Sequence, residues 1–162
     1  MNKHQTEFHR AIALVKDGDA AFAALHDLAK AVADPKLFTV TTIETAAGVA
    51  RRAFSSDPVS YPRSGTKPIH EDDWFRQVHG EQKAFVANTI EEISQRFPDY
   101  ELINSLGCQS VVNLPVVAQG EVIATVNFLH ETGYFTSERV EAIHVEVGLP
   151  ALTAMLISRI SS

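Results

Sequence analysis

The sequence predicts an α+β domain built around an antiparallel sheet. Runs of β-branched and aromatic residues gather at residues 37–55 and 109–130, which favours strands there. Helical periodicity of apolar residues occupies both ends of the chain. The last two apolar runs are separated only by Gln119-Gly120, a spacing typical of an antiparallel hairpin. Clustered strands with flanking helices are the pattern of an α+β fold.

Length and composition fit one globular domain. The chain has 162 residues, of which 45% are apolar and 21% charged. A formal net charge of −6 argues against a nucleic-acid surface, which needs a basic stripe. The N-terminus lacks the apolar run of a signal peptide, no stretch reaches the roughly 20 apolar residues of a membrane span, and the single Cys108 excludes an intramolecular disulfide. We therefore expect a cytoplasmic protein without nucleic-acid or membrane partners.

Two helices are expected at the N-terminus. An apolar stripe at helical spacing over residues 8–15 is interrupted by Asp17-Gly18-Asp19. A second stripe runs from Phe22 to Val32, with Asp19 placed to cap its helix. Residues 1–18 are expected to form a helical arm, and residues 19–162 a single domain.

Two strands are expected next. Residues 37–43 (LFTVTTI) are rich in β-branched and aromatic side chains, and residues 49–55 follow after a short turn. In an extended chain, Arg51 points to one face of the sheet, while Arg52 and Phe54 point to the other.

The segment from Asp57 to Gly107 is predicted to be a loop-rich cap. Its first part, DPVSYPRSGTKP, contains three prolines and a glycine. A short helical segment around Trp74, a brief apolar strand and two short helices follow. Thr89 and Glu92 fit a capping box for the first of these two helices, and Asp99 is placed to cap the second.

The hairpin carries an asparagine in each of its apolar arms, VVNLPVV and VIATVNFL. A buried amide without a partner costs a few kcal/mol, so both need partners. A two-residue turn at Gln119-Gly120 sets Asn113 opposite Val126 and points Asn113 and Asn127 to opposite faces, whereas a three-residue turn brings both to one face. Each asparagine is either a core amide satisfied by protein or an amide that reads a ligand.

Both faces of this hairpin are apolar, so both should be covered. The terminal helices are expected on one face, and the cap of residues 57–107 on the other. A loop-rich cap over a rigid sheet encloses a cavity of the kind that holds a small ligand.

Thr136 or Ser137 is expected to start the last helix. Pro150 lies inside its apolar pattern and is expected to kink or break the helix near Glu146. This helix and residues 8–15 carry more apolar surface than one sheet face needs, which predicts a homodimer through the terminal helices.

The stretch GCQSVVNLPVVAQGEVIATVNFLHETGYFTSERVEAI resembles the closing half of a GAF domain. Ser110, Pro115, Gly120, the VIATVNFL strand and Phe135 follow the order of that family. The resemblance extends over residues 19–159, in the middle third through length and layout. It implies a small, stand-alone, bacterial-type GAF domain that binds a small molecule and acts as a sensory or regulatory module through a dimer or a partner protein.

Known activities of the family narrow this expectation. The Asn-Lys-Phe-Asp-Glu signature that the cyclic-nucleotide-binding members share is missing, and no Cys-His pair resembles the bilin attachment site of phytochromes. Free-methionine sulfoxide reductases use several cysteines, whereas this chain has only Cys108. A redox enzyme of that type centred on Cys108, or a ligand-free association module, are the alternatives to a sensor.

Candidate ligand contacts lie in the cap and on the hairpin. Aromatic side chains beside cations, as at Tyr61, Arg63, Lys67 and Trp74, suit an aromatic or anionic ligand. Cys108 is either a small buried residue or a thiol facing the cavity. The sequence identifies no catalytic residue and no cofactor, and its histidines lack the spacing of a metal site. The eight candidates are Tyr61, Arg63, Trp74, Phe85, Asn88, Cys108, Asn113 and Asn127.

Overall fold

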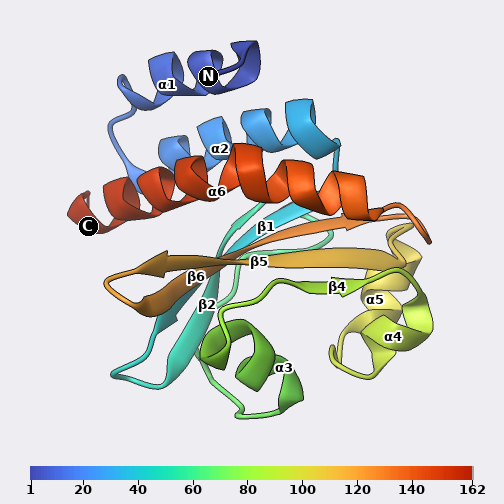
Figure 1. Ribbon diagram of the computed structural model, residues 1–162. Helices are drawn as coiled ribbons and strands as arrows, with labels where there is room; N and C mark the ends of the chain where they lie inside the picture. The colour runs from blue at the N-terminus through green and yellow to red at the C-terminus, as the bar shows by residue number, and fades with distance from the viewer. Residues whose placement is uncertain (162) are drawn as a thin grey trace.

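A six-stranded antiparallel sheet in the order β3-β2-β1-β6-β5-β4 separates a layer of helices from a cap of short elements (Figure 1). The computed structural model describes residues 1–161. This arrangement confirms the α+β prediction, with terminal helices on one face and the cap on the other. The strands are β1 Leu37–Glu44, β2 Val49–Ser55, β3 Lys67–Pro68, β4 Phe85–Ala87, β5 Ser110–Ala118 and β6 Glu121–His130.

The helices follow the predicted order along the chain. The two-residue strand β3 and a π-helical turn at Arg76–Gly80 were not predicted, because neither is long enough to show periodicity. The α-helices are α1 Lys3–Ile12, α2 Gly18–Ala33, α3 Asp73–Phe75, α4 Ile90–Ser94, α5 Tyr100–Ser105 and α6 Ser137–Ile160.

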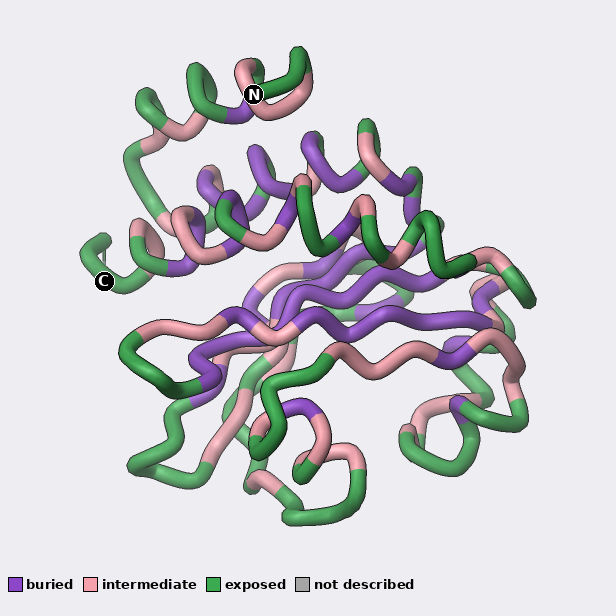
Figure 2. The backbone as a smooth tube through the Cα atoms, viewed as in Figure 1, coloured by how far each residue is buried: buried purple, intermediate pink, exposed green. Residues whose placement is uncertain are grey.

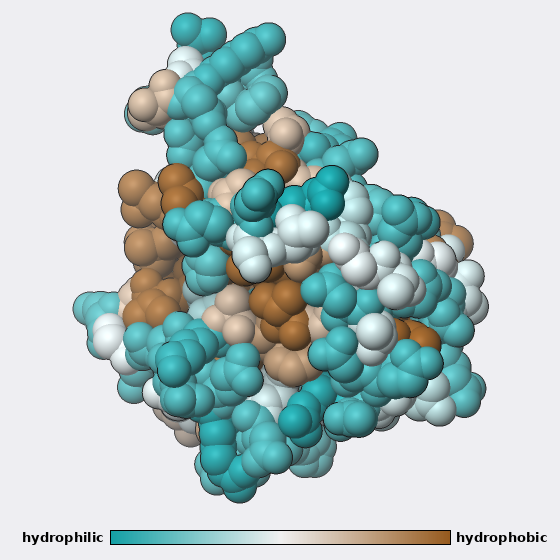
Figure 3. All heavy atoms as spheres, turned by 45° about the vertical axis from the view of Figure 1, so that its right-hand side comes forward, coloured by the Kyte–Doolittle hydropathy of each residue, from teal (hydrophilic) through white to brown (hydrophobic). Residues whose placement is uncertain are grey.

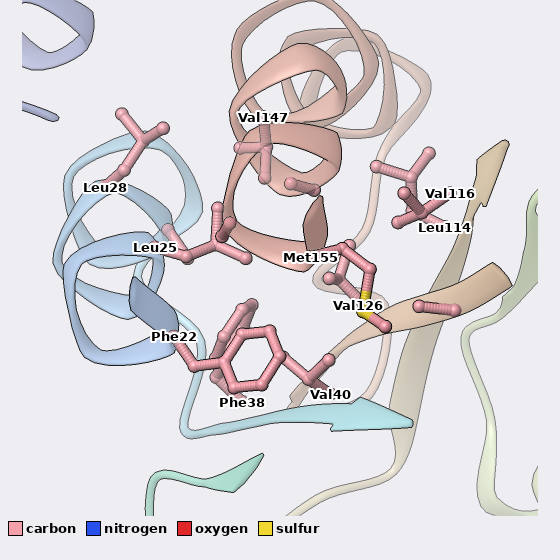
Figure 4. Packing of buried hydrophobic residues seen from close by; sticks show 14 of the residues in the cluster. Phe22, Leu25, Leu28, Phe38, Val40, Leu114, Val116, Val126, Val147 and Met155 are labelled. Carbon is pink, nitrogen blue, oxygen red and sulfur yellow. The ribbon is translucent and has the colours of Figure 1, made fainter. Parts of the chain in front are cut away.

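The main hydrophobic core lies between the sheet and the pair α2 and α6 (Figure 4). Phe22 and Leu25 of α2 and Val147 of α6 point towards Phe38 and Val126 on the strands. All five side chains are buried, so this face of the sheet is fully covered by helices.

The N-cap of helix α2 is Asp17, two residues before the predicted cap at Asp19. The side chain of Asp17 accepts a hydrogen bond from the backbone N–H of Ala20 at 2.8 Å. Asp19 lies in the first turn, and its carboxylate instead pairs with Arg63 at 3.0 Å. The predicted cap at Asp19 is wrong because Gly18 already has helical geometry.

Helix α6 continues through Pro150, so of the predicted kink or break near Glu146 the break does not occur. Proline in a helix interior costs about 3 kcal/mol or more through a lost hydrogen bond and a clash with the preceding turn. Val147 and Ala151, on either side of Pro150, are buried against the core, and their packing holds the helix together.

By length and composition, α6 is also a candidate membrane span, the one that residues 1–161 contain. Its sequence is not an unbroken apolar run, because His144, Glu146 and Arg159 interrupt it. In the structure one side of α6 packs along α2 and over the sheet.

A bulge in the hairpin brings the two asparagines together. Gln119 and Gly120 form the expected two-residue turn, both with positive φ (54° and 81°). The pairing then shifts by one residue at Ile123, so that Asn113 lies opposite Asn127. Of the two arrangements left open by the sequence, the bulge gives the one with both asparagines on one face, and Asn113 does not pair with Val126.

A second bulge separates Arg52 from Phe54. Thr41 pairs with Arg52 and Val40 with Phe54, which leaves Ala53 as the extra residue. Phe54 packs on the helix side, 6.2 Å from the ring of Phe38, whereas Arg52 faces the cap. The prediction that Arg52 and Phe54 share a face is wrong for this reason.

A smaller apolar cluster lies between the sheet and the cap. Ile93 of α4 and Ile103 of α5 pack against Val111 and Leu129 on the strands. Figure 2 shows the central strands buried and the outer turns of the cap exposed. Both faces of the sheet are thus covered, as the apolar hairpin predicts.

Capping of the short helices follows the prediction in one case. Thr89 caps α4 through the N–H of Glu92, and the carboxylate of Glu92 reaches back to Thr89 and Asn88. Asp99 stands at the N-cap of α5, but its side chain makes no capping bond and is directed to the cavity under the cap.

Candidate ligand-binding site

A cavity of about 300 Å³ lies between the sheet and the cap. Strands β1, β2, β5 and β6 supply its floor, and the cap supplies its walls. The bulges at Ala53 and Ile123 decide which strand residues reach it, because each bulge reverses the faces of the residues beyond it. The lining residues are Thr39, Arg52, Tyr61, Lys67, Trp74, Ile93, Phe97, Pro98, Asp99, Ile103, Val111, Asn113, Asn127 and Leu129.

A chain of hydrogen bonds crosses the cavity floor from the cap to the sheet. The indole N–H of Trp74 donates to Oδ1 of Asn113 at 3.0 Å. Nδ2 of Asn113 donates to Oδ1 of Asn127 at 2.8 Å, and Nδ2 of Asn127 donates to the hydroxyl of Thr39 at 3.0 Å. Both amides are nearly fully buried, so protein partners satisfy them where water could not.

A charged group closes another part of the wall. The guanidinium of Arg52 lies 3.7 Å over the ring of Tyr61 and donates to the carbonyl of Pro62 at 2.8 Å. Its Nη2 is 3.7 Å from Oδ2 of Asp99, which accepts the hydroxyl of Tyr61 at 2.7 Å. Burial, and to a smaller extent the hydrogen bond to Asp99, raises the pKa of Tyr61 above its ordinary value, so the phenol stays neutral and donates its proton to that hydrogen bond.

Apolar side chains complete the cavity. The ring of Trp74 meets Phe97 edge-on at 6.4 Å, and Ile93 and Ile103 lie behind them. Trp74 and Phe97 also border a second hollow of about 240 Å³, so their rings stand as a partition between two spaces.

Four of the predicted site residues meet at this cavity: Tyr61, Trp74, Asn113 and Asn127. The sequence placed the first two in the cap and the last two on the sheet. The structure brings them together because the cap folds back over the hairpin.

Three other candidates lie outside the lining of the cavity. Arg63 is drawn to the surface by its ion pair with Asp19. Phe85 packs behind the wall, 6.2 Å from the ring of Phe97. The side chain of Asn88 instead holds the β6–α6 loop, through two 3.0 Å hydrogen bonds with the backbone of Phe135.

Cys108 is fully buried in the cluster under the cap and does not line the cavity. Burial raises the pKa of its thiol to about 11, against the smaller opposing effect of Lys36. A thiol at neutral pH is a weak nucleophile. With no other cysteine in the sequence, Cys108 also lacks a partner for disulfide exchange within the chain.

Sequence reasoning missed the polar residues Thr39, Arg52 and Asp99, which line the cavity together with Lys67, a cation that the sequence had placed beside Tyr61 and Trp74. An arginine inside a strand was a usable signal for Arg52, but the bulge hid its direction. Asp99 was assigned to a helix cap, a role common for aspartate. Among residues 1–161, no three His, Cys, Asp or Glu side chains gather as metal ligands would.

The GAF domain family model matches residues 19–147, which is most of the chain. This chain belongs to the GAF domain family. The match confirms the resemblance over residues 19–147, the cap included. No curated protein sequence is significantly similar to the chain.

Solved structures show the same fold. The GAF domain of a two-component sensor histidine kinase from Bacillus halodurans superposes with a TM-score of 0.72 at 8% identity, covering 91% of this chain and 100% of that one. Residues 122 to 287 of a methyl-accepting chemotaxis protein give 0.69 at 15% identity, covering 98% and 99%.

A GAF-fold enzyme is also among the neighbours. Free methionine-R-sulfoxide reductase from Neisseria meningitidis, in complex with its substrate, gives a TM-score of 0.68 at 15% identity, covering 99% of this chain and 90% of that one. At identities this low, the superpositions show only that these chains share the fold of the GAF domain described here.

Proposed function

We propose that this GAF domain binds a small molecule in the cavity between sheet and cap, and that binding regulates a second copy of the chain or a partner protein. The cavity carries the proposal: it is enclosed by apolar side chains and has a few convergent polar groups, as ligand sites do. Its volume of about 300 Å³ lies at the lower end of the usual range.

The hydrogen bonds under the cap supply a route for regulation. Trp74 ties the cap to Asn113, so a ligand that contacts either one changes how firmly the cap is held. Strands β5 and β6 carry cavity residues on one face and core residues such as Leu114 and Val126 on the other. A ligand that binds better when the cap is in one position shifts the equilibrium between cap positions, and through β5 and β6 it also affects the helical layer on the other side of the sheet.

The output surface that we propose is the outer face of α6 with α1, which pairs with a second copy of the chain. Val145 and Leu149 of α6 are 65% and 72% exposed, and Leu156 and Ile160 continue the stripe. These positions and Leu152 follow steps of three and four residues, the spacing of a helix–helix seam. Figure 3 shows apolar side chains gathered on one side of the helical layer, beneath the N-terminal helix.

The remaining parts of this proposal concern the arm and the compartment. Residues 1–18 act as an arm: α1 borders a hollow of about 340 Å³ against α6, which a second copy would help to cover. We place the domain, residues 19–162, in the cytoplasm, because its one cysteine is a free thiol and suits a reducing compartment.

The alternatives have weaker support. A redox enzyme centred on Cys108 requires a reactive thiolate, and burial disfavours one. A ligand-free association module would have its cavity filled by side chains, whereas this one has space for a small molecule.

The test of ligand binding is native mass spectrometry of the chain purified from its own host. Val111→Phe replaces a small aliphatic side chain of the cavity lining by an aromatic ring that fills part of the space. Val59→Phe, at a position 91% exposed, is the matched control. A bound small molecule is expected with the original chain and the Val59 variant, and is lost from the folded Val111 variant. Equal retention by the Val111 variant would place the binding elsewhere.

The test of dimerisation is light scattering at micromolar concentration. The original chain is expected at twice its 17.8 kDa monomer mass. Leu149→Glu adds a charge to the proposed seam and is expected to give monomers, while Val59→Glu leaves the dimer intact. A monomer mass for the original chain would remove this part of the proposal.

A further inference from the structure

We propose that the cavity takes a small monocarboxylate with a flat, apolar body, and that Arg52 binds the carboxylate of that ligand. The inference rests on the proposed function, because it names the ligand class for the same cavity. Three features of the cavity lead to it: the fixed guanidinium of Arg52, the charge balance of the lining and the aromatic wall.

The guanidinium of Arg52 is held in place with most of its donors unused. The ring of Tyr61 covers one face at 3.7 Å, and the carbonyl of Pro62 takes one N–H at 2.8 Å. Asp99 stands 3.7 Å away, which is within ion-pair reach but beyond a hydrogen bond. An arginine has five N–H donors in a rigid fork, a geometry that matches a carboxylate with two parallel hydrogen bonds.

The charges around the cavity suit one negative charge. Two cations, Arg52 and Lys67, face one carboxylate, Asp99, so the lining has a net charge of +1 in a chain of net charge −6. Within residues 1–161, no hydrogen bond or ion pair engages the ammonium of Lys67, which leaves it available to the ligand. A second negative charge, as on a phosphate monoester, would be repelled by Asp99.

The rest of the lining suits an apolar and flat molecule. Trp74 and Phe97 present rings, and Ile103, Val111 and Leu129 add aliphatic surface from cap and sheet. Aromatic side chains favour offset or edge-on contacts with another ring. A volume of about 300 Å³ limits the ligand to the smaller end of the range that protein pockets accept.

Benzoate is the probe that tests the ligand class, with three comparison compounds. Benzamide keeps the ring without the charge, acetate keeps the charge without the ring, and phenyl phosphate has a ring and a second charge. Trp74 is the chain's single tryptophan and lines the cavity, so its fluorescence reports binding directly. We expect saturable quenching by benzoate, and at least tenfold weaker binding of each of the other three compounds.

Variants identify the residue that binds the carboxylate. Arg52→Gln is expected to weaken benzoate binding at least tenfold, as loss of a charge-assisted hydrogen bond does. Lys67→Gln, at an exposed position where no fold contact is lost, is expected to weaken it two- to fivefold. Arg63→Gln removes an arginine outside the cavity and is expected to leave the affinity within twofold.

Either of two results would overturn the assignment. Benzamide binding as tightly as benzoate would show that the charge is not recognised, and unchanged benzoate affinity in folded Arg52→Gln would show that Arg52 does not bind the carboxylate. If Arg52→Gln fails to fold, Lys67→Gln decides alone, because an unchanged affinity there contradicts the charge argument. If benzoate does not bind, while native mass spectrometry shows a small molecule bound to the original chain and absent from Val111→Phe, the ligand class is rejected and the proposed function stands.

Discussion

The pair Asn113 and Asn127 offers a quantitative test of the bulge in the hairpin. Replacing either asparagine by leucine keeps the approximate shape of the side chain and strands the amide of the other. Asn113→Leu removes the acceptor of Trp74 and the donor to Asn127, and Asn127→Leu removes the acceptor of Asn113 and the donor to Thr39. Each single variant therefore leaves buried polar groups without partners.

The size of the effect follows from the buried hydrogen bond. A buried polar group without its partner costs about 1–3 kcal/mol, whereas removing both partners of one bond together is nearly neutral for that bond. Each single variant should lose about 2 kcal/mol of unfolding free energy. The double variant should lose about 1–2 kcal/mol less than the sum of the single losses, since the shared bond between Asn113 and Asn127 is counted in both.

Urea denaturation of the four chains measures this coupling, because the slope for small proteins is about 1–3 kcal/mol per molar urea and a 2 kcal/mol loss moves the midpoint by roughly 1 M. Thr153→Ala, on the outer side of α6, is the control partner for Asn127→Leu, and that pair should be additive within about 0.5 kcal/mol. Additivity for Asn113 with Asn127 as well would refute the shared bond. It would favour an unbulged hairpin in which Asn113 faces Val126.

Three further predictions concern groups elsewhere in the fold. Cys108 should resist a thiol-labelling reagent in the native state at neutral pH and react once the chain is unfolded; rapid native labelling would contradict its burial and raised pKa. Burial lowers the pKa of His26, His79 and His130, so the unfolded chain binds protons more readily than the folded chain; the contribution of these groups to stability is fully present above pH of about 6.5 and is lost as the pH drops below it. Urea midpoints from pH 7 to 5 measure this fall, and replacing all three histidines by glutamine should flatten it, while an unchanged slope would exclude them as its cause. A methyl group at Gly18 of α2 would lie 2.8 Å from Oγ of Ser158 in α6, so Gly18→Ala should lower the unfolding free energy by about 1–3 kcal/mol, with partial recovery in a Ser158→Gly background. No loss in Gly18→Ala would show that α2 and α6 do not touch at this point.

The sequence was sufficient for the layers of the fold, because each layer has its own periodicity. Apolar residues on both faces of the hairpin at residues 109–130 require cover on both sides of the sheet, and the apolar helices at the two ends of the chain cover one side. The family match at residues 19–147 agrees with this layout. The helix does not break before Pro150, one of the two outcomes expected there, because burial of one side of α6 outweighs a local penalty, and such packing leaves no sign in a short window of sequence.

The cavity was harder to predict, because a bulge turns all the side chains beyond it to the opposite face of the sheet. Gln119-Gly120 correctly indicates a two-residue turn, yet no residue type marks Ile123 as the extra residue. The same limit applied at Ala53, where the bulge turns Arg52 towards the cap. The side chain of Asp99 could cap a helix or face a cavity, and only the tertiary position of Tyr61 and Arg52 decides between these.

The polar chain from Trp74 to Thr39 does more than satisfy two amides. Apolar side chains at positions 113 and 127 would seal the cap to the sheet over a range of nearly equivalent positions, since hydrophobic contact is non-directional. Hydrogen bonds at 3.0 and 2.8 Å fix one position of the indole and one register of the hairpin. An indole N–H that bonds the cavity floor can also exchange that bond for one to a ligand at little net change in energy. A cap held in this way suits the proposed function, because its position is defined without a ligand and the bond that defines it is one that a ligand would replace.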